Sequence, residues 1–213
     1  TAQNTWDSGT DTYNGAPVGE NGAALEHLCF SREFSVRLET FQSRRKIQHY
    51  LGAAAIFYPH WDAAYAQRLL EAFQLDPQQK LSQLSKGQGA MVTALLALAS
   101  RADVTFLDEP TAGLDVVMRE KFYHLLLEDF AQTGRTFVLS THIIQEAAPL
   151  FERVLILDQG RLLENASADE LLSQFRTLSG RADQVELACQ GLTVLTTHDL
   201  GRRRTCTVRG SAE

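Results

Sequence analysis

Apolar residues gather in short runs along this chain, and the run at 104–107 is the most informative of them. It contains only apolar and β-branched residues, and it leads directly into Asp108, Glu109 and Pro110. An uninterrupted run of this length with a sharp polar end predicts a central parallel strand that is buried on both faces. Ligands of open α/β sheets bind just beyond the carboxyl ends of such strands. The pattern therefore points to the two carboxylates as candidates for chemistry.

The rest of the pattern predicts an alternation of strands and helices. Strands are expected within 8–15 and at 28–33, 136–140, 154–158 and 161–163. Apolar side chains recur at helical spacing within 43–84, 89–100 and 116–132. This alternation is typical of an α/β fold, in which helices flank a mainly parallel sheet. The last segment differs, because a strand, a helix and two strands are expected at 176–179, 181–189, 192–197 and 204–208.

Composition limits the possible functions more than it identifies one. The chain has 213 residues, of which 44% are hydrophobic and 22% charged, so it can form one large domain, or one domain plus a small appendage. The net charge of −6 provides no basic field for nucleic acid. Cys29, Cys189 and Cys206 are widely spaced, which favours reduced thiols in a cytosolic protein. The longest apolar stretches are too short to span a bilayer, so a membrane role requires a partner.

Two adjacent carboxylates at the end of a strand have a specific chemical use. One carboxylate can hold Mg²⁺ while the other activates water, as metal-assisted nucleotide hydrolysis requires. The strand 136–140 ends in Thr141 and His142, and His142 is the strongest candidate for the same site among the six histidines. That His142 lies beside Asp108 and Glu109 is what the family resemblance given below implies.

A second candidate site begins at Ser85. Ser85 and Gln88 have the spacing of a capping box at the start of the helix 89–100. One interpretation is simply a well-capped helix. The other uses the same physics, because free amides and the positive end of the helix dipole form a site for an anion such as a γ-phosphate. Gly87 lets the backbone approach closely, and Lys86 adds a positive charge.

Four segments, in this order, resemble the motifs of the ATP-binding-cassette (ABC) ATPase family. They are the signature-like Leu84-Ser85-Lys86-Gly87-Gln88, the Walker B-like strand ending in Asp108-Glu109, the D-loop-like Ala112-Gly113-Leu114-Asp115, and Thr141-His142, which resembles the switch histidine. Lys86 stands where the family usually has glycine. The resemblance implies a P-loop NTPase-like fold, with a partial ABC ATPase domain over 1–175. This domain would include an α-helical subdomain at about 43–100, and a small α+β appendage would follow at 176–213.

The resemblance also implies roles for single residues. Asp108 would hold Mg²⁺ through water, Glu109 would polarise the attacking water, and His142 would bind the γ-phosphate of ATP. Ser85, Lys86, Gly87 and Gln88 would contact the nucleotide of a second subunit, and Asp115 would lie at the dimer axis. Asp115 is equally a candidate N-cap of the helix 116–132. Glu33 stands where the family usually has a glutamine that senses the metal and the γ-phosphate, and Gln42 is the alternative for that role.

The phosphate loop of the family has no counterpart in this sequence. That loop needs G-x-x-x-x-G-K-[ST], but the chain contains no Gly-Lys dipeptide and its first lysine is Lys46. The segment 19–23 echoes such a loop only superficially, and 21–28 has the pattern of a short helix that leads into the next strand. We therefore expect an N-terminally incomplete cassette that is inactive as an ATPase by itself.

Three functional hypotheses are compatible with these motifs. The preferred one is the ATP-binding and ATP-hydrolysing subunit of an ABC transporter, here without its phosphate loop; the chain opens with Thr rather than Met. The second is a degenerate, non-hydrolytic subunit that lends its signature motif to a competent partner. The third is an ABC-type ATPase outside transport, although neither a coiled-coil insertion nor a second cassette is present.

The preferred hypothesis implies a second nucleotide-binding subunit in a head-to-tail dimer and a transmembrane permease as partners. It also implies a cytoplasmic position, peripheral on the inner face of the cell membrane. Three segments, at 29–33, 57–62 and 117–123, look most similar to subunits of drug- or antibiotic-exporting systems.

Overall fold

The computed structural model describes residues 9–32, 45–142 and 147–210. The chain divides into two compact units, 1–144 and 145–213. The two units divide between residues 144 and 145, whereas the motifs predict a domain boundary after residue 175. The boundary after 175 stays a prediction.

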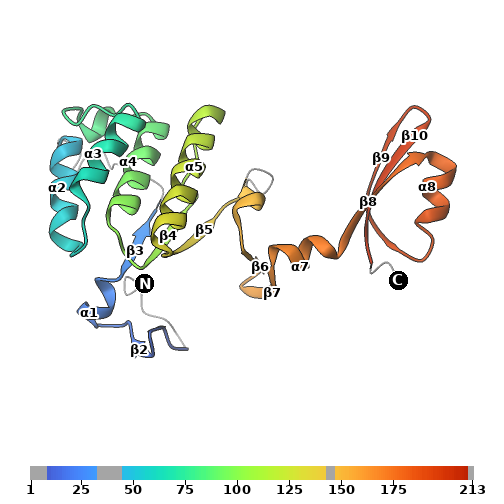
Figure 1. Cartoon of the computed structure of the whole chain (residues 1–213), viewed down its shortest axis with the longest axis horizontal. Helices are drawn as coiled ribbons and strands as arrows, with labels where there is room; N and C mark the ends of the chain where they lie inside the picture. The colour runs from blue at the N-terminus through green and yellow to red at the C-terminus, as the bar shows by residue number, and fades with distance from the viewer. Residues whose placement is uncertain (1–8, 33–44, 143–146, 211–213) are drawn as a thin grey trace. The chain divides into compact units, whose positions relative to one another are not determined.

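A three-stranded parallel sheet forms the centre of the first unit (Figure 1). Its order is β3 (Leu28–Ser31), β4 (Val104–Asp108) and β5 (Thr136–Ser140), and both pairings are parallel. The strand that carries the acidic pair is therefore central, as predicted. Because all three strands run the same way, their carboxyl ends meet at one edge of the sheet, and the α/β fold is confirmed.

The burial of β4 differs from the prediction. Its residues alternate, so that Thr105 and Leu107 are buried while Val104 and Phe106 are only half-buried. Cys29 and Ser31 of β3 share the buried face, because the register pairs them with Thr105 and Leu107. Helix α4 (Lys86–Ala99) packs on β3 and β4 and covers one face of the sheet. Among the described residues, no other helix makes as many contacts with β4. An apolar run alone does not reveal that asymmetry.

Three helices of the first unit pack around α4: α2 (Ile47–Phe57), α3 (Ala63–Ala72) and α5 (Val116–Thr133). The described part of the unit also contains α1 (Gly22–Leu25), which contacts β3, and a short 3-10 turn, η2 (Leu81–Gln83). Helix α4 contacts α2, α3 and α5, and nine of its 14 residues are buried (Figure 1). Such an almost completely apolar helix is stable only inside a core. The predicted helical region before β4 is therefore confirmed.

Polar side chains fix the starts of these helices. Asp62 accepts a hydrogen bond from the amide of Tyr65, and Asp115 accepts one from the amide of Met118. Ser85 and Gln88 form both bonds of the predicted capping box, and α5 ends at Gly134 in a left-handed conformation (φ +65°). These caps satisfy amides that a helix start leaves unpaired.

A small hairpin lies at the amino-terminal side of the same sheet. Strands β1 (Thr12–Tyr13) and β2 (Ala16–Pro17) pair antiparallel, as the turn signals predict. The Tyr13 hydroxyl donates to the Asp103 carboxylate at 2.5 Å, and His27 Nδ1 lies 2.8 Å from the same oxygen. Asp103, the residue that precedes β4, therefore connects the hairpin to the start of that strand.

The second unit contains two antiparallel sheets. Strands β6 (Arg153–Asp158) and β7 (Arg161–Ser167) form the predicted hairpin, preceded by a 3-10 turn, η3 (Ala148–Leu150). Helix α7 (Ala168–Ser173) follows, with the predicted capping box between Ser167 and Glu170. The helix expected at about 143–151 falls partly on 143–146, outside the described residues.

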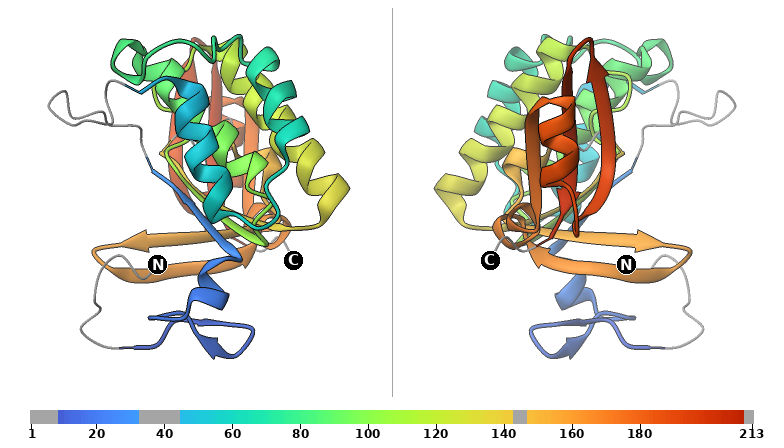
Figure 2. Two further views of the ribbon diagram at one scale, coloured as in Figure 1. Left: turned by 90° about the vertical axis from the view of Figure 1, so that its left-hand side faces the viewer. Right: turned by 90° about the vertical axis from the view of Figure 1, so that its right-hand side faces the viewer.

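The end of the chain forms the predicted β-α-β-β arrangement. Strands β8 (Phe175–Arg181), β9 (Thr193–Leu200) and β10 (Arg203–Arg209) have the order β8-β10-β9, and α8 (Ala182–Ala188) packs on β8 and β10 (Figure 2, right). The small core beneath α8 contains Val185, Cys206 and Val208. In neither unit is any described helix long and apolar enough to cross a membrane.

Candidate functional site

The carboxyl ends of β4 and β5 bring the acidic pair next to Ser140. The register pairs Asp108 directly with Ser140. The Ser140 hydroxyl donates to Asp108 Oδ1 at 2.6 Å, and the Ser140 carbonyl oxygen accepts the amide of Glu109 at 3.1 Å. A single residue at the end of β5 therefore holds both acids, one through its side chain and the other through its backbone.

His142 reaches the same group of residues from just beyond β5. Its backbone amide donates to Glu109 Oε1 at 3.1 Å, and its ring Nδ1 lies 2.8 Å from the same oxygen. The His142 side chain is 75% exposed and that of Glu109 is 30% exposed. The structure thus places the imidazole on the same side of the sheet as the acids, as the motif order predicts.

The backbone of Glu109 is strained. Its φ is +46°, a left-handed backbone conformation that residues other than glycine and asparagine seldom adopt. Such strain persists only where the surroundings hold it in place, and it clusters at functional sites. The contacts from Ser140 and His142 supply that restraint.

One oxygen of Glu109 has no partner. Its Oε2 is buried and accepts no hydrogen bond, while Oε1 accepts both bonds from His142. The hydroxyl of Thr111, in the turn that follows, is also buried and unpartnered. Buried polar atoms of this kind are normally satisfied by protein, water or an ion, so this turn has capacity for a further donor.

The carboxylates of Asp108 and Glu109 can bind a hard cation such as Mg²⁺ only together with ligands from another molecule. Mg²⁺ prefers oxygen ligands and usually takes one or two carboxylates together with waters and substrate phosphates. Asp108 is exposed at the sheet edge, and Glu109 Oε2 is free. The described residues contain no group of three or more potential metal-binding His, Cys, Asp or Glu side chains. The acids therefore fit a Mg²⁺ that arrives with a phosphorylated ligand, and they do not form a self-sufficient metal site.

The start of α4 packs closely on the turn after Pro110. A Cβ atom on Gly87 would lie 2.7 Å from the carbonyl oxygen of Gly113, and one on Gly113 would lie 3.0 Å from Lys86 Cγ. Gly113 itself has a φ of +80°. The signature-like and D-loop-like segments are thus in direct contact, and both glycines are required there by space or by backbone conformation.

The remaining predicted residues fall into three classes. Ser85 and Gln88 are engaged in the capping box, with Gln88 Oε1 accepting the Ser85 amide at 3.0 Å, and Asp115 caps α5. Lys86 is exposed at the first turn of α4. Glu33 and its alternative Gln42 lie outside the described residues.

Ser140 is the functional candidate that the sequence did not reveal. It precedes the conspicuous Thr-His pair, and its importance comes from the β4–β5 register, which places it opposite Asp108. The sequence does contain a signal, because a serine at the end of one strand can donate to a carboxylate at the end of a neighbouring strand. Recognising that signal requires knowing that β4 and β5 are neighbours.

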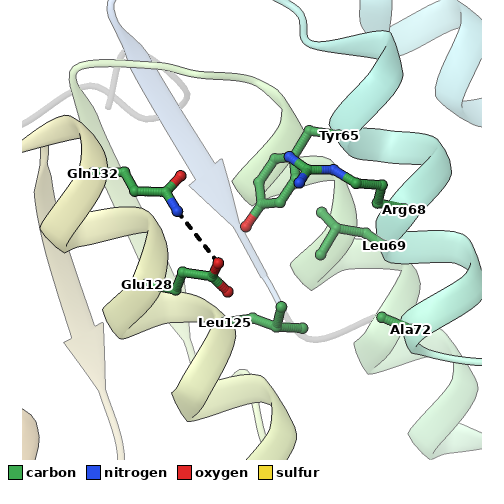
Figure 3. A pocket seen from close by; sticks show the side chains of 7 residues that line it. All are labelled: Tyr65, Arg68, Leu69, Ala72, Leu125, Glu128 and Gln132. Carbon is green, nitrogen blue, oxygen red and sulfur yellow. Dashed lines mark hydrogen bonds between the residues drawn. The ribbon is translucent and has the colours of Figure 1, made fainter.

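A small cavity lies elsewhere, between α3 and the second half of α5 (Figure 3). Its volume is about 150 Å³, and it is lined by Tyr65, Arg68, Leu69, Ala72, Leu125, Glu128 and Gln132. Burial raises the pKa of Tyr65 to about 12, and the nearby Asp129 carboxylate acts in the same direction. None of its lining residues belongs to the sheet edge that carries the acids, so the cavity is a separate feature.

Comparisons with known proteins identify the family. The family described as "AAA domain, putative AbiEii toxin, Type IV TA system" matches residues 39–147, about half of the chain. The ABC transporter ATP-binding protein YtrB of Bacillus subtilis is 22% identical over 169 residues, which cover 79% of this chain and 56% of that protein. The phosphonates import ATP-binding protein PhnC 2 of Nostoc is 38% identical over 120 residues, covering 55% and 49%.

Solved structures show the same fold. An ATP-binding subunit of an ABC transporter superposes with a TM-score of 0.66 at 22% identity, covering 78% of this chain and 69% of that one. A dimeric ATP-binding cassette bound to ADP and phosphate superposes with a TM-score of 0.59 at 21% identity, covering 73% and 72%. The chain spans about half the length of the two curated relatives named above. PhnC 2 is an import protein, so the resemblance to exporting systems gains no support from it.

Proposed function

This chain belongs to the AAA-domain family that matches it, and its relatives are ABC transporter ATP-binding proteins. We propose that it is the part of such a transporter subunit that carries the residues for ATP hydrolysis. In this proposal Asp108 holds Mg²⁺ through water, Glu109 polarises the attacking water, and His142 binds the γ-phosphate of ATP. Mg²⁺ would neutralise charge on the phosphates during transfer. Glu33 remains the proposed sensor of metal and γ-phosphate.

The observation that carries the proposal is the placement of His142 Nδ1 at 2.8 Å from Glu109 Oε1, beside Asp108. The three residues proposed as metal ligand, base and phosphate-binding imidazole lie at the carboxyl edge of a parallel sheet, where nucleotides bind in such folds. The free Oε2 of Glu109 supports the role of a base, because it is the oxygen left for a water molecule.

The second part of the proposal concerns the start of α4. Ser85, Lys86, Gly87 and Gln88 would contact the nucleotide of a second subunit in a head-to-tail dimer, with Asp115 near the dimer axis. A helix dipole contributes only about 0.3–1 kcal/mol, and a charge-assisted hydrogen bond about 1.5–3 kcal/mol. Millimolar binding already needs about −4 kcal/mol. This segment is therefore at best half of a site, and the other half must be a phosphate loop.

No such loop occurs within these 213 residues. We therefore propose that the chain by itself does not hydrolyse ATP. A second subunit and a membrane permease are its proposed partners, at the cytoplasmic face of the membrane. The alternative is a non-hydrolytic subunit that lends its signature motif to a competent partner; the complete Ser85–Gln88 capping box supports this alternative equally well.

The test is a complementation assay. The 213-residue chain is purified alone and also fused behind the strand–phosphate loop–helix segment of a relative such as PhnC 2. We expect background Mg-ATP hydrolysis for the chain alone and measurable hydrolysis for the fusion. Glu109→Gln should abolish the activity of the fusion while ATP binding persists. Leu187→Gln, at an exposed position in α8, is the matched control and should leave activity unchanged.

The two hypotheses predict different outcomes. Robust hydrolysis by the unfused chain would overturn the proposal that it lacks an essential part. A folded fusion that binds ATP without hydrolysing it, yet stimulates a competent relative in a mixture, would favour the alternative. In that mixture Ser85→Ala should remove the stimulation, because the signature motif acts on the partner's nucleotide.

A further inference from the structure

The C-terminal β-α-β-β part brings together two cysteines that are distant in sequence. Cys206 lies in β10, is 3% exposed, and belongs to the core formed with Val185 and Val208. Cys189 is the C-terminal cap of α8, is half-buried, and packs against that core. Cys206 is close enough to Cys189 to help raise its pKa, and both thiols are free.

The surroundings give the two thiols different accessibility. The Cys206 Sγ lies 3.4 Å from the Thr197 hydroxyl on β9, and it is enclosed by the sheet and α8. Cys189, at the end of the helix, is only half-buried and is therefore the more accessible of the two residues. The guanidinium of Arg204 is close enough to act on the charge of Cys189, and it is held by Asp199 at 2.7 Å and 3.0 Å.

We propose that Cys189 and Cys206 form a dithiol modification site that reacts with small-molecule disulfides such as glutathione disulfide. Cys189 is the attacking residue because it is the more accessible of the two, and Cys206 is the resolving residue because it belongs to the core against which Cys189 packs. The product is an internal Cys189–Cys206 disulfide. This inference is independent of ATP chemistry and of the proposed function.

The reaction balances in two exchange steps. The Cys189 thiolate attacks one sulfur of the small disulfide, so that a mixed disulfide forms and one small thiolate leaves and takes up a proton. The Cys206 sulfur, after losing its proton to solvent, then attacks the Cys189 sulfur. The internal disulfide forms, the second small thiolate leaves and is protonated, and the two cysteines together have lost two electrons. The small disulfide is the oxidant and is reduced to two thiols.

Electrostatics predicts how this reaction depends on pH. Burial raises the pKa of Cys189, Cys206 acts in the same direction, and Arg204 opposes both. Because the thiolate is the nucleophile, a raised pKa makes reaction at neutral pH slow and makes it faster as pH rises. The site is therefore expected to respond to sustained oxidising conditions rather than to brief ones.

Cys29 provides an internal comparison. It lies in the first unit, is fully buried in β3, and burial raises its pKa. Tyr58 and Ser100 act in the opposite direction on that pKa. Because Cys29 is not exposed to solvent, it should stay reduced under conditions that oxidise the pair.

The test uses the full 213-residue chain without nucleotide. The protein is incubated with excess glutathione disulfide at mildly alkaline pH, quenched with acid, and analysed by intact mass and by non-reducing peptide mapping. The expected product has lost two hydrogens, links Cys189 to Cys206, and leaves Cys29 reduced. Its thermal unfolding midpoint should rise, because the new bond joins α8 to β10 and closes the segment containing β9.

Variants establish the order of the two steps. Cys206→Ser should stop at a stable mixed disulfide on Cys189, with a mass increase of one glutathione unit. Cys189→Ser should give no internal disulfide and little adduct, and Cys29→Ser should behave like the wild type. Circular dichroism confirms that each variant is folded, and the wild-type peptide map needs no variant at all. An unreacted wild-type chain, an unresolved adduct, or a bond involving Cys29 would each overturn the proposal.

Discussion

The guanidinium of Arg135 forms a bidentate pair with the carboxylate of Asp129. Nε donates to Oδ1 at 2.9 Å, and Nη2 donates to Oδ2 at 2.8 Å. Arg101 adds a third bond to Oδ2 at 3.0 Å, and the Asp129 side chain is fully buried. Arg101 also binds Asp62 at the start of α3. One buried carboxylate thus links α3, α5 and the residues that lead into β4 and β5, whose far ends carry the candidate site.

This relationship predicts a large effect for Asp129→Asn. The substitution leaves two guanidinium groups next to a neutral amide in the interior, and breaking a buried pair typically costs about 3–5 kcal/mol. Urea unfolding monitored by circular dichroism measures the loss. Asp183→Asn is the control, because its pair with Arg181 is mostly exposed and should contribute under about 1 kcal/mol. Equal effects of the two substitutions would show that the Asp129 cluster is not a structural centre.

Two glycines in helices should respond to alanine with opposite signs. In Gly87→Ala the new methyl would lie 2.7 Å from the Gly113 carbonyl oxygen, so the turn after the acidic pair must move and the protein should lose stability. In Gly52→Ala, within α2, nothing lies within 4 Å of the new methyl. Alanine should stabilise that helix by about 0.8–1 kcal/mol. Thermal unfolding of both variants checks the signs, and stabilisation by Gly87→Ala would contradict the close packing.

Ser140 is predicted to be a positioning residue for Asp108. Ser140→Ala removes the 2.6 Å bond to Asp108 Oδ1, and losing a partner that orients a metal ligand typically costs about 10–100-fold in metal affinity or activity. The variant is tested in the ATP-competent fusion by measuring the Mg²⁺ concentration that gives half-maximal hydrolysis. Mn²⁺ binding to the same protein, followed by electron paramagnetic resonance, gives a readout without turnover.

Ser140→Thr separates positioning from folding. Threonine keeps the hydroxyl and suits a strand, so this variant should restore most of the metal affinity. Both variants should unfold at nearly the wild-type urea concentration, because the bond is exposed. If Ser140→Thr were as defective as Ser140→Ala, the hydroxyl would not be the active feature.

Stability should fall in acid, partly through Asp62. The hydrogen bond from the Tyr65 amide lowers the pKa of Asp62 below its ordinary value, and Arg101 acts in the same direction. A carboxyl with a depressed folded-state pKa contributes stability that is fully present above its unfolded pKa, near 3.9. That contribution is lost as pH falls through the lower, folded-state value. Hydrogen bonds from Tyr13 and Ser167 likewise lower the pKa values of Asp103 and Glu170.

Asp62→Asn tests the Asp62 contribution. The amide oxygen can still cap α3, but the titrating charge is gone. Urea unfolding from neutral pH down to about pH 3 should show a variant that is less stable than wild type at neutral pH and approaches it in acid. Curves that stay parallel over the whole range would mean that Asp62 does not contribute to the acid dependence.

Local signals in the sequence determined most of the element pattern. The capping boxes at Ser85 and Ser167, the cap at Asp115 and the turn at Gln159-Gly160 all depend on partners within a few residues. Such short-range bonds form wherever the chain adopts the local structure, so a pattern of residue types predicts them. The acidic pair after a central strand was predictable for the same reason, and the family motifs fixed the order of the parts.

Tertiary structure alone decided several contacts that no motif predicted. The contacts of Ser140 with Asp108 and of Asp129 with Arg101, and the packing of Cys189 against the core that contains Cys206, depend on strand order, register and helix packing. The same packing made β4 buried on one face and only half-buried on the other. These contacts arise because burying apolar side chains of α4 and α8 against their sheets selects one arrangement among many with the same local structure, and no short stretch of sequence encodes that choice.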